Sequence, residues 1–240
     1  MFRHTGQHRT QAHNIRLAAL LCLTAGFVNV AGFLAFSVLT TNVTGHVALF
    51  ADNLAHGDFA TARVVGLWMF LFLLGAFLSS IIVNNIFHNK QYSYVIPIVT
   101  EIAILIMVAS YGYHFNRTVG ETEFFAGSLL FAMGMQNALV SMVSGSVVRT
   151  THLTGMFTDL GIELAALIRH TGLGKKELKD KILLRVIIIF FFFLGGILGG
   201  YLFGILHYHT FFIPAGILTI ALSYDVFRFN AIKLARKITH

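Results

Sequence analysis

Charge is scarce in this chain. Only 11% of its 240 residues are charged and 56% are hydrophobic, which leaves too little polar surface to cover a water-soluble globule. Three long stretches, 17–51, 124–148 and 186–224, contain no Lys, Arg, Asp or Glu. An uncharged run of about 20 residues crosses the hydrocarbon core of a bilayer as a helix. The sequence therefore predicts an all-α polytopic membrane protein whose first partner is the lipid bilayer.

Other absences narrow the function. The only cysteine, Cys22, lies inside the first apolar run, so an internal disulfide framework is excluded. The chain has no G-x-x-x-x-G-K-[ST], H-E-x-x-H or G-x-S-x-G sequence, the signatures of ATP binding and of two kinds of hydrolase. We therefore expect no enzyme activity, and the sequence predicts no cofactor and no metal site.

The net charge of +7 would suggest a nucleic-acid partner in a soluble protein. In this chain the basic residues lie in loops and tails, where the positive-inside rule for membrane proteins explains them. We expect no nucleic-acid partner. The same rule places both termini in the cytoplasm.

The chain repeats itself. Four landmarks recur in the same order in both halves. The first is a Gly and an Asn in an apolar run (Gly26 and Asn29, then Gly134 and Asn137), and the second is a Thr-Gly segment (40–45, then 150–155). The third is a run of small residues (74–80, then 194–200), and the fourth is a proline after Ile (Pro97, then Pro214). A single chance match would not preserve this order. We interpret the chain as two tandem copies of one membrane unit.

Each copy is predicted to hold one long helix, one short Thr-Gly helix and two further long helices. The expected ranges are 15–38, 43–57, 64–87 and 94–113 in the first copy, and 124–147, 153–170, 184–207 and 210–227 in the second. The resulting divisions are a basic tail (1–14), repeat 1 (15–113), a connecting loop (114–123), repeat 2 (124–227) and a second basic tail (228–240).

The short Thr-Gly helices leave two topologies open. The first has about a dozen residues before Asp52, and the second carries Asp159 and Glu163, which are costly where they face lipid. Such a helix is typical of a re-entrant or broken element lining a cavity. Each half then has three crossings and the copies are inverted. The alternative is eight full crossings with parallel copies.

The Thr-Gly segments are the strongest candidate site. Threonine caps helix N-termini, and glycine allows a tight turn, so two short helices would point free N–H groups and partial positive charge into the membrane interior. Facing ends of this kind bind an anion or a polar solute. The alternative is that the Thr-Gly segments only cap and pack two broken helices. The predicted substrate-binding residues are Asn29, Asn42, Thr44, Gly45, Asn137, Arg149, Thr151, Thr154 and Gly155.

Four titratable residues are candidates for proton coupling. His152, Asp159 and Glu163 are seven and four residues apart, which puts them on one helical stripe. Such a stripe could bind a metal or relay protons, but a polar face on a wet cavity is the simpler interpretation. Glu101 follows Pro97 in an apolar run, and an intramembrane acid is a functional candidate by default.

Small residues four apart form two further faces, Gly195 with Gly199 and Gly196 with Gly200. Such faces let membrane helices approach closely. They predict either the contact between the two halves or the surface of a homo-oligomer.

The motif residues resemble a known family. T-N-V-T-G in the first half, and M-Q-N-A followed by R-T-T-H-L-T-G in the second (135–138 and 149–155), are similar to the YoaK-like family of bacterial inner-membrane proteins, a family of unknown function. The resemblance runs from about 18 to 227. It implies a polytopic bacterial membrane protein and supplies no substrate.

Three functions remain open from the sequence. The leading hypothesis is a permease or exporter for an unknown small solute or anion, with its site at the paired Thr-Gly turns. The second is a scaffold or accessory subunit, which predicts a dry, fully packed interior. The third is an intramembrane enzyme, which requires His152, Asp159 and Glu163 to converge.

Overall fold

The computed structural model describes residues 11–86, 94–114, 118–169 and 174–238, and every regular element within these ranges is helical. The helices are α1 (Gln11–Phe36), α2 (Val43–Ala55), α3 (Phe59–Ile81), α4 (Val95–Tyr111), α5 (Val119–Ser144), α6 (Leu153–Arg169), α7 (Lys175–Leu206) and α8 (Phe212–Ile238). Three shorter helices extend or join them: a π-helix (Ile82–Ile86) and two 3-10 helices (Gly112–His114 and His207–Phe211). The prediction of an all-α membrane protein is confirmed.

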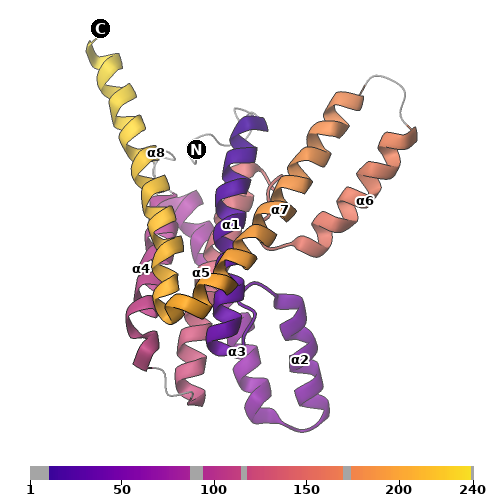
Figure 1. Cartoon of the computed structure of the whole chain (residues 1–240), viewed down its shortest axis with the longest axis vertical. Coiled ribbons are helices and arrows are strands. Elements are labelled where there is room, and N and C mark those ends of the chain that lie inside the picture. The colour runs from indigo at the N-terminus through magenta and orange to yellow at the C-terminus, as the bar shows by residue number, and fades with distance from the viewer. Residues whose placement is uncertain (1–10, 87–93, 115–117, 170–173, 239–240) are drawn as a thin grey trace.

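Five helical stretches of the described residues are long and apolar enough to cross a membrane. The last of them, Lys175–Asp225, reverses direction at His207–Phe211 and so contributes two separate helices, α7 and α8 (Figure 1). The short helices α2 and α6 are not among them. With 13 residues, α2 is about 20 Å long, well short of the hydrocarbon thickness.

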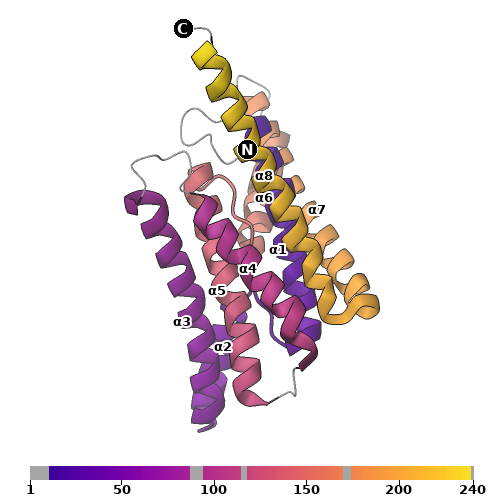
Figure 2. The same cartoon turned by 90° about the vertical axis from the view of Figure 1, so that its left-hand side faces the viewer.

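Helices of the two halves of the chain alternate in the packed bundle. The helix α1 packs along α7 and α5 packs along α3, while each short helix packs on the long helix that follows it. The helix α4 packs against α5 and α8. Figures 1 and 2 place α1 and α5 between the outer helices, in agreement with the high buried fraction of both.

Glycines permit the two closest helix contacts. A side chain at Gly26 of α1 would collide with the backbone carbonyl oxygen of Phe192 on α7, and one at Gly134 of α5 would collide with that of Phe72 on α3. In the opposite direction, Gly195 faces the Leu23 carbonyl. Only residues without a Cβ allow helix backbones to approach this closely.

Each helix of the second half runs opposite to its counterpart in the first. Along the vertical axis of Figures 1 and 2, α1, α2 and α4 descend and α3 ascends, whereas α5, α6 and α8 ascend and α7 descends. The two short helices begin near the middle of the molecule, and they extend toward opposite ends.

Three sequence predictions need correction in their extent. The loop 114–123 is helical from Val119, because the Thr118 hydroxyl accepts the Glu121 N–H at 3.3 Å and caps α5. Between the expected helices 153–170 and 184–207, the residues from Lys175 onward form the first turns of α7, where Lys181 pairs with Glu177 at 2.9 Å. The tail 228–240 is helical through Ile238, and residues 1–10 of the N-terminal tail lie outside the described residues.

The glycine pairs of α7 settle a question that the sequence left open. Gly195 and Gly199 face the α1 backbone at Leu23 and Phe27, and Gly196 and Gly200 face the Val30 side chain. They form the contact between the two halves. Because α1 covers them, these faces do not provide the homo-oligomer surface that was the other prediction.

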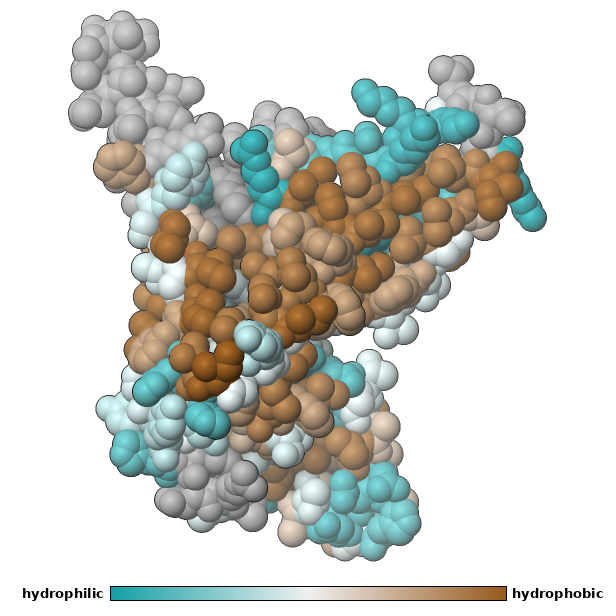
Figure 3. Space-filling view, in the orientation of Figure 1, coloured by the Kyte–Doolittle hydropathy of each residue, from teal (hydrophilic) through white to brown (hydrophobic). Residues whose placement is uncertain are grey.

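The surface pattern agrees with a membrane environment. Hydrophobic residues cover the middle of the molecule and the arm formed by α6 and α7, and hydrophilic residues gather at its ends (Figure 3). The same view shows an indentation between this arm and the α2–α3 hairpin below it.

Candidate functional site: a polar cavity between the two Thr-Gly turns

A cavity of about 560 Å³ lies where the two Thr-Gly turns meet. Its polar lining consists of three amides and four hydroxyls, together with the His152 ring: Asn29, Asn42, Asn137, Thr41, Thr44, Thr151 and Thr154. The apolar lining is Leu39, Val43, Phe72, Leu153 and Phe192. The volume is typical of a small-molecule site, and no lining residue is acidic.

The first turn is held by the side chains that the sequence singles out. The Asn29 side-chain oxygen accepts the Thr41 N–H at 3.1 Å, which ties the turn back to α1. The Thr40 hydroxyl donates to the Val28 carbonyl at 3.4 Å. Asn42 caps α2 by accepting the Gly45 N–H at 3.0 Å. Asn29 and Asn42 thus fix the turn and border the cavity at once.

The second turn has the same elements with fewer internal bonds. The Asn137 side-chain oxygen, the counterpart of Asn29, is buried and accepts no hydrogen bond within the described part of the chain. The buried Thr150 hydroxyl, which matches Thr40, also has no partner there. A buried amide oxygen without a donor is costly, so a donor supplied by a bound solute or by water would be stabilising at Asn137.

Gly45 and Gly155 leave space for the side chain three residues before each of them. Neither lines the cavity. A Cβ at Gly45 would lie 2.7 Å from the Asn42 amide nitrogen, and one at Gly155 would collide with the His152 ring. The absence of a side chain therefore lets the preceding polar residue fold over the start of each short helix.

Both short helices direct their N-termini toward the cavity. Among the described residues, no acceptor binds the backbone N–H of Val43, Thr44, Leu153 or Thr154. The first N–H groups of a helix carry partial positive charge and favour an anion or a hydrogen-bond acceptor. Two such ends at one cavity that lacks carboxylates make a site suited to a negatively charged or strongly hydrogen-bonding solute.

Phe72 and Phe192 line the cavity but were not among the predicted residues. Each lies three residues before a glycine of the small-residue run, Gly75 or Gly195, and each presents its carbonyl to the glycine of the facing first helix. That matched spacing is the signal in the sequence that could have identified them. The Gly-x-x-Asn pattern explains the geometry, because the glycine admits the phenylalanine backbone and the asparagine follows one helical turn later.

The titratable candidates do not gather at one point. Asp159 and Glu163 of α6 both contact Arg185 of α7, at 3.1 and 3.7 Å, whereas His152 borders the cavity. Glu101 is buried in α4, and its Oε1 has no partner in the described part of the chain. Arg149 is exposed and outside the cavity lining. No three His, Cys, Asp or Glu residues of the described ranges are placed to hold a metal ion.

Arg185 extends this cluster to the second turn. Its guanidinium also lies 3.5 Å from the Val147 carbonyl and 3.3 Å from the Met156 sulfur. One cation therefore joins α7, α6 and the segment that leads into the second Thr-Gly turn. This residue was not predicted, because its partners Asp159 and Glu163 lie on another helix.

Comparison with known proteins agrees with this architecture. The UPF0700 transmembrane protein YoaK of Bacillus subtilis (strain 168) is 26% identical over 191 residues, which cover 78% of this chain and 83% of the Bacillus protein. No solved structure matches the chain. The family model described as a protein of unknown function (DUF1275) matches residues 17–224, which include both Thr-Gly turns and all the cavity residues. The chain is therefore an integral membrane protein of the DUF1275 family.

Proposed function

We propose that this protein is a permease or exporter for a small polar or anionic solute, which binds in the cavity between the two Thr-Gly turns. The observation that carries the proposal is the meeting of both turns, 110 positions apart in the sequence, at one polar cavity. Free helix N–H groups, three amides and four hydroxyls would bind the solute.

In this proposal, the helical bundle is that of a transporter built from two inverted copies of one unit. Equivalent helices run in opposite directions (Figure 1), and equivalent glycines, Gly26 and Gly134, admit equivalent phenylalanine carbonyls. With α2 and α6 as broken elements, each half contributes three crossings. Secondary transporters of this kind bind their substrates near the bilayer midplane at helix breaks.

Charge supports an orientation with both termini in the cytoplasm of a bacterial inner membrane. The start of α1, the end of α8 and the start of α7 lie at the same end of the molecule. Four lysines fall in the first turns of α7, Lys175, Lys176, Lys179 and Lys181. Basic residues are concentrated on the cytoplasmic side of membrane proteins.

The two other hypotheses have less support. A scaffold needs no polar cavity between the two short helices, whereas a buried polar atom such as the Asn137 side-chain oxygen is costly there unless a solute or water binds it. An enzyme would require its titratable groups to meet, but Asp159 and Glu163 are engaged by Arg185 rather than by His152. We therefore also propose that the chain is not an enzyme.

Access to the cavity can be tested before any solute is known. The only native cysteine, Cys22, is buried, so single cysteines can be introduced at Thr44 and Thr154 and treated with a membrane-impermeant thiol reagent from either side of oriented vesicles. We expect both to react, and their reactivity to differ between the two sides. Ala25→Cys, in the buried face of α1, is the control. Reactivity as low as that of the control at both sites would refute a solute pathway.

Transport itself tests the role of the hydroxyls. Proteoliposomes would be assayed for uptake of labelled chloride, nitrate, acetate and glycerol. Replacing Thr44 and Thr154 together by valine should abolish the uptake that the wild-type protein supports and leave folded protein in the membrane. Thr219→Val is the matched control, since this hydroxyl bonds within its own helix, to the Ala215 carbonyl at 2.7 Å. Unchanged uptake by the double variant would remove the site assignment.

A further inference from the structure

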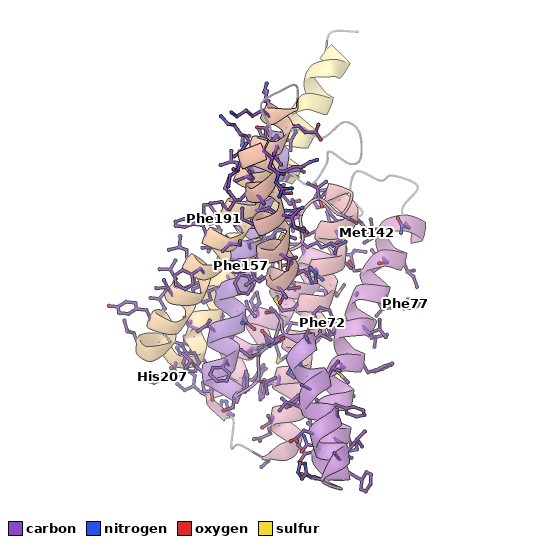
Figure 4. The ribbon with its side chains drawn as sticks, turned by 90° about the vertical axis from the view of Figure 1, so that its right-hand side faces the viewer. Phe72, Phe77, Met142, Phe157, Phe191 and His207 are labelled. Carbon is purple, nitrogen blue, oxygen red and sulfur yellow. The ribbon has the colours of Figure 1, made fainter. Side chains whose placement is uncertain are left out.

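An apolar groove opens beside the polar cavity. It encloses about 720 Å³ between α1, α6 and α7, and no polar side chain lines it. Phe157 and Leu160 of α6 form one wall, and Val186, Ile189 and Phe193 of α7 form the other. Figure 4 faces this side of the molecule, with Phe157 of the groove above Phe72 of the cavity.

The groove and the cavity adjoin each other. Leu153, the first residue of α6, lines both spaces, and so does Phe192 of α7. A ligand that lies along both spaces would have one end in the groove and the other at the Thr-Gly turns. The polar end meets helix N-termini and amides, and the apolar end meets only hydrocarbon.

The first half of the chain has different side chains at the equivalent place. There, the Phe50 ring of α2 packs over Gly66 of α3, where a Cβ would lie 3.2 Å from the ring. The matching residues of the second half are Leu160 and Val186, which bring a smaller side chain from α6 and a larger one from α7. The repeated architecture alone therefore does not determine the lining of the groove.

We infer that the ligand is a single-chain amphiphile with an anionic head, held with its head in the cavity and its hydrocarbon chain in the groove. This inference rests on the proposed function and narrows its substrate class. Helix N-termini favour the negative charge, and the lining of the cavity has no carboxylate to repel it. The groove offers the chain aromatic and aliphatic surface along one continuous path.

The probe is palmitate carrying a diazirine midway along its chain, added to the full-length protein in lipid nanodiscs. On illumination, the label should attach to peptides of α6 and α7 that contain Phe157, Ile189 or Phe193. Butyrate, palmitate, hexadecyl phosphate and the uncharged hexadecanol serve as competitors, and protection of a cysteine at Thr154 from a thiol reagent reports on the head site. Hexadecyl phosphate and palmitate distinguish a phosphate from a carboxylate head.

Two variants separate the head site from the chain site. Leu160→Phe combined with Val186→Gly transfers the first half's filling arrangement into the groove, and Leu160→Trp fills the groove without a new glycine. Either should lower the ratio of long-chain to butyrate affinity about tenfold, because only the chain loses its contacts. Thr44→Val, which removes a hydroxyl donor from the cavity lining, should weaken long-chain and short-chain competitors alike. The ratio in each variant is compared with the ratio in the wild-type protein, so that the partition of palmitate into the bilayer cancels.

The possible results are distinct. A ratio that falls on filling the groove, with competition by palmitate or hexadecyl phosphate but not by hexadecanol, supports the amphiphile. Butyrate protection with an unchanged ratio overturns it and leaves a small-solute site intact. Labelling that hexadecanol competes equally, and that Thr44→Val does not affect, also overturns it, because the groove then holds only bulk lipid. Cysteines at Thr44 and Thr154 that are both as unreactive as the Ala25→Cys control refute the proposed function as well.

Discussion

Replacing Gly26 by alanine should be one of the most destructive single-methyl changes in the chain. The new Cβ would collide with the Phe192 carbonyl oxygen and would lie 3.0 Å or less from two further Phe192 backbone atoms. Backbone cannot rotate away as a flexible side chain can, so α1 and α7 must separate. Overpacking of this kind costs about 1–3 kcal/mol, and we expect the upper part of that range.

Matched glycines isolate the collision from the general effect of alanine in a helix. Gly204 of α7 and Gly216 of α8 have open space where a Cβ would project, so alanine there should be neutral or stabilising by up to about 1 kcal/mol. Gly134→Ala, which would collide with the Phe72 carbonyl, should behave like Gly26→Ala. The assay is the thermal midpoint of the purified protein in detergent, read by the loss of the monodisperse chromatographic peak. Equal midpoints for the Gly26 and Gly216 variants would refute the close-contact reasoning.

Four further predictions follow from individual contacts. Arg185→Met leaves Asp159 and Glu163 without their cation and should lower the stability by about 1–3 kcal/mol, a range reduced from that of a fully buried pair because Asp159 is partly exposed. Adding Asp159→Asn and Glu163→Gln should restore much of the thermal midpoint. No restoration would contradict the pairing. Arg63→Met breaks a more exposed pair with Glu123 and should lower the stability by less than about 1 kcal/mol in the same assay. A loss of stability equal to that of Arg185→Met would contradict this prediction. The only tryptophan, Trp68, packs against the His46 ring at 5.8 Å, so His46→Ala should shift its fluorescence to longer wavelength and His152→Ala should not. Hydrogen bonds from the Thr61 hydroxyl and backbone N–H lower the pKa of Asp58, so the Asp58 cap of α3 stabilises the fold above the ordinary pKa of aspartate and loses that effect as pH falls through the lowered pKa. Asp58→Asn should therefore reduce the loss of stability at acid pH. An unchanged loss of stability at acid pH would exclude this cap as a contributor.

The local signals of the sequence were reliable where one residue type has one physical use. Uncharged runs located the long helices, because charge is costly in hydrocarbon. The Thr-Gly segments marked both short helices, which begin at Val43 and Leu153. Helix extents outside the apolar runs were less visible. The start of α5 at Val119 depends on the Thr118 cap, and the polar turns of α7 are stabilised by pairs such as Glu177 with Lys181, neither of which hydropathy reports.

The candidate site was predictable in its parts and not in its assembly. Asn29 and Asn137 recur at matched positions in the sequence, but only the packed bundle brings them to one cavity. Phe72 and Phe192 were missed because an aromatic residue in an apolar run is most simply read as core. Arg185 was missed because its partners, Asp159 and Glu163, lie on another helix.

By itself, the sequence determined a membrane-embedded, all-helical chain with two special breaks, since hydropathy and backbone chemistry are local properties of the residues. Only the tertiary structure decided that the glycine faces of α7 join the two halves, that both breaks border a single cavity, and that an apolar groove opens beside the second of them. These outcomes depend on which helix surfaces meet. The shapes of distant side chains, such as Phe50 over Gly66 in one half and Leu160 beside Val186 in the other, acquire a consequence only when the helices are packed.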